Sequence, residues 1–138
     1  MNATKGYLLD TSAMIDHLRS REKVTSFIER IAGEGEIVGC CCINVAEVHS
    51  GMREKERKKT ERFIGSLFYF EVTREVAALA GELKKEYAQK GITLSTADTL
   101  IAAVCMVYQL ILVAENVKHF PYPNLTVINP LDREEKSL

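Results

Sequence analysis

The chain has 138 residues, of which 46% are hydrophobic, and this size fits a single domain with a sizeable core. Its formal net charge is −1 at pH 7, so any attraction to nucleic acid must come from a local patch. The first residues lack the pattern of a secretory signal, and the longest apolar stretch is too short to cross a membrane. These features predict one domain over residues 1–138, with a frayed C-terminal tail, in a cytoplasmic protein without a membrane partner.

The four cysteines form no C-x-x-C pattern, which excludes an obvious zinc or redox motif and fits a reduced protein. Three of them are consecutive in the apolar run EIVGCCCI (residues 36–43). We expect Cys40, Cys41 and Cys42 to be small hydrophobic side chains of a buried strand.

Strand-like and helix-like segments alternate along the chain. Strands are predicted at 6–10, 36–43, 69–72, 110–114 and 125–129, and helices at 11–20, 24–33, 73–91 and 95–109, with two more, joined by a charged stretch, within 44–68. Thr73 is the expected N-cap of the helix that Gly91 ends. This alternation favours an α/β domain whose central sheet is mainly parallel and flanked by helices. In such sheets, ligands bind beyond the carboxyl ends of the strands.

Three carboxylates are predicted at this edge of the sheet. Asp10 directly follows a strand, Glu47 is expected in the first turn of the helix after CCCI, and Asp98 begins a later helix. Carboxylates that cluster raise one another's pKa unless a cation lies among them. A set of ligands made of oxygen atoms alone suits Mg²⁺ or Mn²⁺.

The alternative interpretation is that these acids belong to helix caps. The sequences NVAE (residues 44–47) and STAD (residues 95–98) both match a capping box, and an acid in the first turn suits the helix dipole. Taken singly, Glu47 and Asp98 are explained more readily in this way. Asp10 is not, because Thr11 and Ser12, which follow it, are the better capping candidates.

Four segments together resemble the PIN-domain family, and specifically the VapC-type toxins of toxin–antitoxin pairs. They are YLLDTSAMIDHL, INVAEVHSGM, LSTADTLIAAVCMVYQLILVAENVKHF and LTVINP, between about residue 7 and residue 130. The resemblance implies a compact α/β fold and a ribonuclease that depends on Mg²⁺ or Mn²⁺. Asp10, Glu47 and Asp98 match the family's first, second and third metal-binding acids, and Ser12 matches a small polar residue that supports the first.

The last motif departs from the family pattern. In VAENVKHF, Ala114 stands where the family usually has Thr or Ser, Asn116 is retained, and His119 replaces an acid that often precedes Phe. Glu115 is a candidate substitute for this fourth acid. Whether one or two metal ions act is therefore left open.

The resemblance implies a role for each acid in RNA hydrolysis. Asp10 and Asp98 would hold the metal ion, with Glu47 binding directly or through water. In-line attack would leave a 5′-phosphate and a 3′-hydroxyl. Glu47 is our candidate for positioning or deprotonating the attacking water.

A second set of residues consists of candidates for RNA contact. The run 53–62 holds six basic residues and three acids, which is typical of a solvated helical face. Its alternative role is contact with the RNA backbone, for which Arg53 is the best single candidate because it lies nearest Glu47 in the chain. His119 would donate to a phosphate if protonated, or it is an exposed imidazole.

The expected partners are an RNA substrate, a VapB-type antitoxin and a second copy of the chain in a homodimer. Two other functions stay open. One is a housekeeping PIN ribonuclease without an antitoxin. The other is a catalytically weak PIN domain that binds RNA or a partner.

Overall fold

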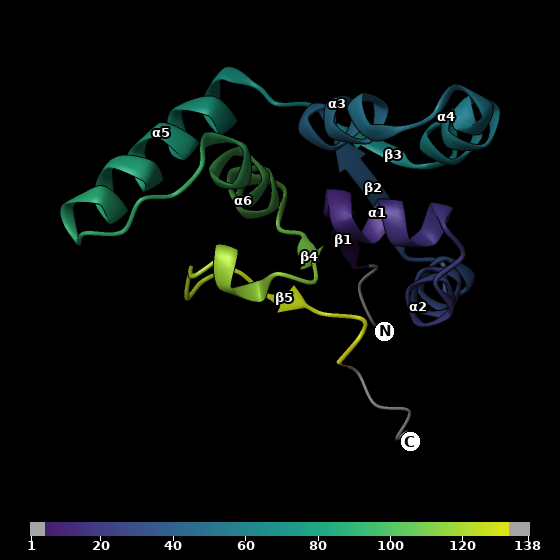
Figure 1. Cartoon of the computed structure of the whole chain (residues 1–138). Helices are drawn as coiled ribbons and strands as arrows, with labels where there is room; N and C mark the ends of the chain where they lie inside the picture. Colours follow the sequence, from purple (N-terminus) through teal and green to yellow (C-terminus); the bar gives the residue numbers. More distant parts are fainter. Residues whose placement is uncertain (1–4, 133–138) are drawn as a thin grey trace.

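The computed structural model describes residues 5–132, and the expected C-terminal tail lies outside them. No helix of this part of the chain is long and apolar enough to cross a membrane. Figure 1 shows a central sheet with helices packed around it. The strands are β1 (Gly6–Leu9), β2 (Ile37–Cys41), β3 (Phe68–Phe70), β4 (Ile111–Val113) and β5 (Val127–Ile128). The helices are α1 (Thr11–Leu18), α2 (Glu22–Gly33), α3 (Cys42–Gly51), α4 (Arg57–Ser66), α5 (Arg74–Gln89) and α6 (Thr96–Tyr108), with short 3₁₀ turns η1 (Glu54–Glu56) and η2 (Val117–His119).

The five strands form one sheet in the order β3-β2-β1-β4-β5, and every neighbouring pair is parallel. The expected α/β fold with a mainly parallel sheet is therefore confirmed. The chain builds outward from β1 to β3 on one side and then crosses to β4 on the other. The strand order thus reverses beside β1, and such a reversal is where parallel sheets form ligand sites.

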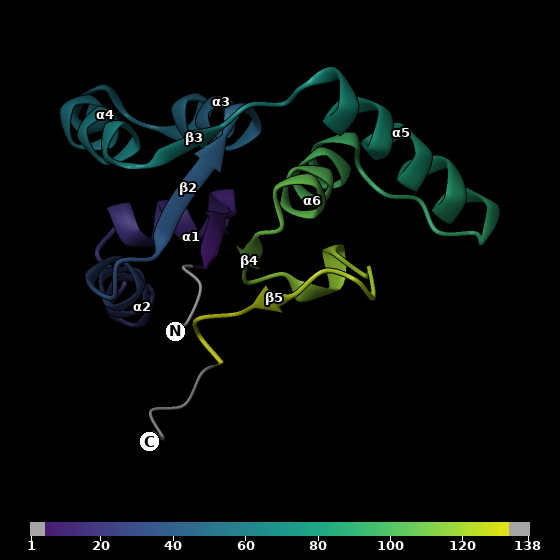
Figure 2. The ribbon, with the colours of Figure 1, turned by 180° about the vertical axis from the view of Figure 1, so that it is seen from behind.

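Alternating side chains of the strands enter two separate cores. In β1, Leu8 packs into the core under α5 and α6, whereas Tyr7 and Leu9 pack into the core under α1 and α2. Successive residues of a strand point to opposite faces, so a strand between two helical layers must be apolar throughout. Figure 2, from behind, shows the same arrangement with α5 and α6 on one side and α1 and α2 on the other.

The helix α6 was expected to be central because it has little polar surface. Its residues 101–105 are all buried, and it packs against α5. Thr73 caps α5 as predicted, since its hydroxyl accepts a hydrogen bond from the Val76 backbone at 3.2 Å. Gly91 follows the end of α5 with a φ of +81°, a conformation that glycine adopts without strain.

The boundary between β2 and α3 differs from the sequence-based prediction. The strand ends at Cys41, and Cys42 is already helical. Asn44 is the third residue of α3, where its side chain accepts a hydrogen bond from the Cys41 backbone at 2.9 Å. Asn44 is therefore not the N-cap of this helix. Glu47 lies in the second turn, so both its first-turn placement and its interpretation as a capping residue are wrong.

The start of α1 also needs a correction. The helix begins at Thr11, and Asp10 occupies the N-cap position with an extended backbone, but its side chain makes no capping hydrogen bond. Thr11 and Ser12 were expected to be the better caps, yet both lie inside the first turn. The Asp10 carboxylate at the end of β1 is therefore not accounted for by helix capping.

A close approach of β3 to β2 leaves no room for a side chain at Gly39. A Cβ atom there would lie 2.4 Å from the Phe68 carbonyl oxygen and 2.5 Å from the Phe70 ring. We expect Gly39→Ala to lower the free energy of unfolding by about 1–3 kcal/mol, as overpacking does. Urea denaturation followed by circular dichroism measures this change.

The matched control is Gly81→Ala, in α5. A Cβ atom there has nothing within 4 Å, so alanine is expected to stabilise the helix by about 0.5–1 kcal/mol. Equal midpoints for the two variants would contradict the close packing of β3 on β2.

Candidate active site

Asp10 lies at the carboxyl end of β1, where the strand order reverses. Its backbone N–H still donates to the Val113 carbonyl of β4, at 2.9 Å, which fixes the residue to the sheet. The pKa of its carboxyl is raised to about 6, first because burial removes water from the charged form and further because Asp98 and Glu47 carry like charges nearby. Hydrogen bonds from the Thr11 backbone and the Ser12 side chain oppose this rise.

Asp98 is the third residue of α6, and a different side chain caps this helix. Ser95 caps the helix, because its hydroxyl accepts a hydrogen bond from the Asp98 backbone at 3.0 Å. The Asp98 carboxylate instead lies 3.6 Å from Nδ1 of His119. The sequence proposed His119 as an RNA contact; the structure places it beside this acid.

Glu47 is exposed on α3, and its carboxylate reaches back to α1. Its Oε1 accepts a hydrogen bond from the Thr11 hydroxyl. The Thr11 oxygen in turn accepts one from Nδ2 of the buried Asn44, at 3.3 Å. Sequence reasoning missed Thr11 and Asn44 as site residues, although Thr11 adjoins Asp10 and Asn44 stands three residues before Glu47. Both had been assigned only to helix capping.

The remaining candidates differ in their burial and in their hydrogen bonds. Ser12 donates to Oδ2 of Asp10 over a long 3.4 Å. Ala114 is buried, Glu115 is partly buried and Asn116 is exposed. The Asn116 side chain makes no hydrogen bond with another residue of 5–132.

The residues present suit a metal ion by type, although they do not form a closed cage. Within residues 5–132, no group of three or more His, Cys, Asp or Glu side chains is gathered closely enough to hold a metal. However, Asp10 is a partly buried carboxylate whose pKa is raised by two other carboxylates, an arrangement that a cation would stabilise. Mg²⁺ usually takes one or two protein carboxylates and completes its shell with water and phosphate. The donor set therefore fits such an ion.

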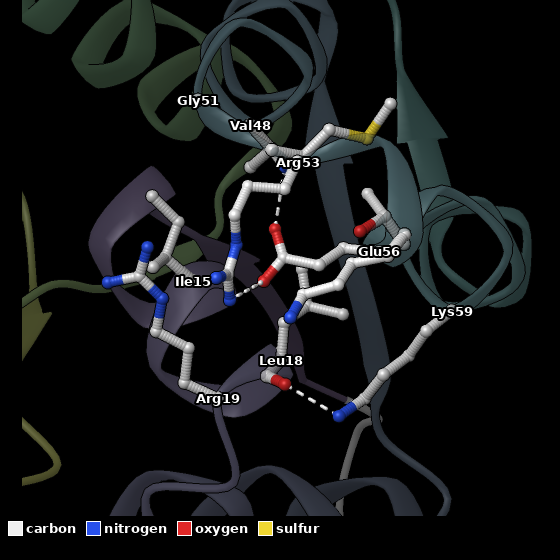
Figure 3. Close-up of a pocket in the computed structure, with 11 residues that line it drawn as sticks. Ile15, Leu18, Arg19, Val48, Gly51, Arg53, Glu56 and Lys59 are labelled. Carbon is white, nitrogen blue, oxygen red and sulfur yellow. Dashed lines mark hydrogen bonds and ion pairs between the residues drawn. The ribbon is translucent and has the colours of Figure 1, made fainter.

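A pocket of about 280 Å³ opens between α1, α3, η1 and α4 (Figure 3). Apolar side chains such as Ile15, Leu18 and Val48 line it. Arg53, the other candidate RNA contact, lines it too and pairs with Glu56 at 3.1 Å. The remaining charged residues of the lining are all basic: Arg19, Lys55 and Lys59.

The fold and the sequence together define the class of protein. A family model described as PIN domain matches residues 7–121, which include the three acids. The chain belongs to the PIN-domain family.

Individual relatives refine this assignment. Ribonuclease VapC19 of Mycobacterium tuberculosis is 30% identical over 119 residues, which cover 86% of this chain and 95% of that protein. Ribonuclease VapC2 of Rickettsia felis is 26% identical over 130 residues, covering 89% and 96%. The toxin-antitoxin structure of VapBC2 from Rickettsia felis, bound to a DNA fragment from its promoter, superposes with a TM-score of 0.81 at 25% identity, covering 90% of this chain and 98% of the matched chain. The resemblance to VapC-type members of the family is confirmed.

Proposed function

We propose that this protein is an endoribonuclease that hydrolyses RNA phosphodiester bonds, that it is the toxin of a VapBC-type toxin–antitoxin pair, and that it depends on Mg²⁺ or Mn²⁺. Its relatives of similar length are named ribonucleases, which supports the reaction. The observation that carries the proposal for the site is Asp10, a carboxylate held at the end of the central strand against the charges of two others. Strongly shifted carboxyl groups of this kind cluster at functional sites.

Asp10 and Asp98 are the residues that would hold the metal ion, with Glu47 as a third ligand, directly or through water. When bound, such an ion polarises the scissile phosphate and lowers the pKa of a bound water. The chain's own contribution is to orient these groups. Glu47 is the most exposed of the three acids, and its proposed role is to position the attacking water or to accept its proton.

Cleavage of a labelled single-stranded RNA of mixed sequence tests the proposed reaction. We expect the wild type to cut it with Mn²⁺, to stop after EDTA is added, and to leave 5′-phosphate ends. Asp10→Asn is expected to lose the activity.

The second candidate function is a catalytically weak PIN domain that binds RNA or a partner. The observation that favours it is Ala114, a buried methyl group where the family usually has a hydroxyl. RNA binding by the wild type without cleavage under the same conditions would select this function.

A VapB-type antitoxin is the proposed protein partner, because the solved relatives include VapBC and other toxin-antitoxin complexes. The pocket between α1, α3, η1 and α4 is the proposed place for a segment of that partner, since its lining is basic and apolar and includes Val48, the residue that follows Glu47. The expected homodimer stays a prediction, which sedimentation of the isolated chain would test.

Two lysines of the run 53–62 are candidates for contact with the RNA backbone. In the run 53–62, Arg53 and Arg57 pair with glutamates, and Lys59 donates to the Leu18 carbonyl at 2.6 Å. Lys55 and Lys58 are exposed and pair with no acid of residues 5–132. We expect Lys55→Gln combined with Lys58→Gln to reduce the slope of log affinity against log salt by about 1–2, at about one unit per lost contact.

The lysine variants are made in an Asp10→Asn background, which is expected to bind RNA without cutting it. Fluorescence anisotropy at several salt concentrations then gives this slope. The control removes the same charge from α5 and the residue that follows it, with Lys85→Gln and Lys90→Gln. An unchanged slope in the Lys55 and Lys58 variant would show that this surface does not meet the RNA.

A further inference from the structure

We infer that Asn44 and Thr11 are positioning residues that hold the Glu47 carboxylate in one orientation for the reaction. This inference rests on the proposed nuclease function. The three side chains form a continuous line of hydrogen bonds that begins at the backbone of β2. It runs from the Cys41 N–H to Asn44, from Asn44 to Thr11, and from Thr11 to Glu47.

The direction of every hydrogen bond in this line is fixed by its first member. A backbone N–H only donates, so the Asn44 amide must present Oδ1 to Cys41, at 2.9 Å. Its Nδ2 then faces Thr11, at 3.3 Å, and an amide nitrogen also only donates. The Thr11 hydroxyl has one hydrogen, and because its oxygen already accepts from Asn44, that hydrogen is directed at Glu47. The end of the strand thus dictates the donor that the carboxylate receives.

Burial restricts the movement of Asn44, the first side chain of this line, but not that of Glu47, the last. Asn44 is fully buried, Thr11 is partly buried and Glu47 is exposed. An exposed glutamate on a helix has several rotamers of similar energy. A donor directed at Oε1 selects the rotamer that turns the side chain toward Thr11 of α1. It leaves Oε2 without a hydrogen bond to another residue of 5–132.

The line also joins two parts of the site that are far apart in sequence. Thr11 immediately follows Asp10, the acid at the end of β1, whereas Asn44 and Glu47 lie one turn apart on α3. A shift of α3 relative to α1 would therefore be transmitted to Glu47 through Thr11. Groups that orient a metal ligand or a catalytic acid in this way usually change activity by about 10–100-fold when removed.

Thr11 is the residue to test, because the fully buried Asn44 is needed at the start of α3. Thr11→Val keeps the shape of the side chain and removes the hydroxyl, and Thr11→Ser keeps the hydroxyl. We expect Thr11→Val to lower kcat for RNA cleavage by about 10-fold or more with KM little changed. Thr11→Ser is expected to retain activity within about 3-fold of the wild type, because the donor is still present.

Two further measurements separate positioning from a loss of stability. In a Glu47→Gln background, Thr11→Val is expected to cause no further loss, because the residue acts through Glu47. The concentration of Mn²⁺ that gives half of its thermal stabilisation is expected to rise in Thr11→Val and not in Thr11→Ser. The matched control is Thr25→Val in α2, whose buried hydroxyl has no partner among the described residues, and it should change none of these values.

The inference is overturned if Thr11→Val cleaves RNA as well as Thr11→Ser, or if its effect adds fully to that of Glu47→Gln. Failure of the proposed function is a separate result, in which the wild type itself cuts no RNA. In that case the Mn²⁺ midpoints still decide: different values for the valine and serine variants support the positioning line, and equal values refute it.

Discussion

Asp10→Asn is expected to make the metal-free protein more stable than the wild type at pH 7. The pKa of Asp10 is raised from 3.8 to about 6 in the folded protein, so ionising this carboxyl costs folding free energy. At about 1.4 kcal/mol per pKa unit, and with a discount for partial exposure, asparagine should recover about 1–3 kcal/mol. Thermal melting in EDTA should show a transition several degrees higher.

The same difference should depend on pH in a defined direction. Below pH 3.8 the Asp10 carboxyl is protonated in both the folded and the unfolded state, so the two proteins should be equally stable. Between pH 3.8 and about 6 the unfolded state loses its proton first, so the wild type loses stability relative to the variant as pH rises. Above about pH 6 the difference should be constant.

The matched control is Asp16→Asn, on α1. Asp16 lies 3.4 Å from the exposed Arg21, and loss of such a surface pair costs about 0–1 kcal/mol. This variant should therefore be no more stable than the wild type. A destabilised Asp10→Asn at pH 7 would mean that Asp10 has a structural role, as a cap or hydrogen-bond acceptor.

Glu47→Gln is expected to reduce kcat for RNA cleavage by about 10²–10⁴-fold, the range for loss of a general acid or base. The fold should remain intact, because Glu47 is exposed and glutamine still accepts the Thr11 hydrogen bond. Mn²⁺ should still raise the melting temperature, since Asp10 and Asp98 are unchanged. Single-turnover cleavage and thermal melting measure the two effects separately.

Glu115→Gln is the comparison for this variant, because Glu115 is the candidate substitute for the missing fourth acid. Asp98 and Glu47 are the carboxylates that raise the pKa of Asp10, and Glu115 is not among them. We therefore expect its loss to change kcat less than Glu47→Gln does. Unchanged cleavage by Glu47→Gln would remove Glu47 from the reaction, and an equal loss in both variants would bring Glu115 into the site.

The order of strands and helices was predictable because buried strands and amphipathic helices have different patterns of apolar residues. Strands between two helical layers are apolar at every residue, as in GYLL and ILV, whereas α5 buries only one face, with Val76, Ala80 and Tyr87 at helical spacing. The end of β2 was not predictable in this way. Cys42 and Ile43 are as apolar as the strand, and the change to helix is determined by the hydrogen bond of Asn44, a tertiary detail of one side chain.

In the candidate site, too, local sequence patterns predicted some features, and tertiary contacts determined the others. Placing Asp10 after a strand and Asp98 early in a helix required only the pattern of elements and the rule for parallel sheets, whereas Glu47 was expected one turn too early in its helix. The side chains that contact these acids could not be predicted from that pattern. Thr11 contacts Glu47 across 36 positions of sequence, and His119 lies beside Asp98 because η2 folds back toward α6. Such contacts depend on how helices pack, which no local pattern encodes.

The central claim is that Asp10, Asp98 and Glu47 are a metal site, and thermal melting with and without Mn²⁺ tests it most directly. An ion that binds only the folded state must raise the melting temperature. We predict that Mn²⁺ stabilises the wild type but not Asp98→Asn, and that the metal-free variant melts no lower than the metal-free wild type. If Mn²⁺ has no effect on the wild type and Asp98→Asn melts lower, Asp98 has a structural role and the metal-dependent nuclease proposed here is contradicted.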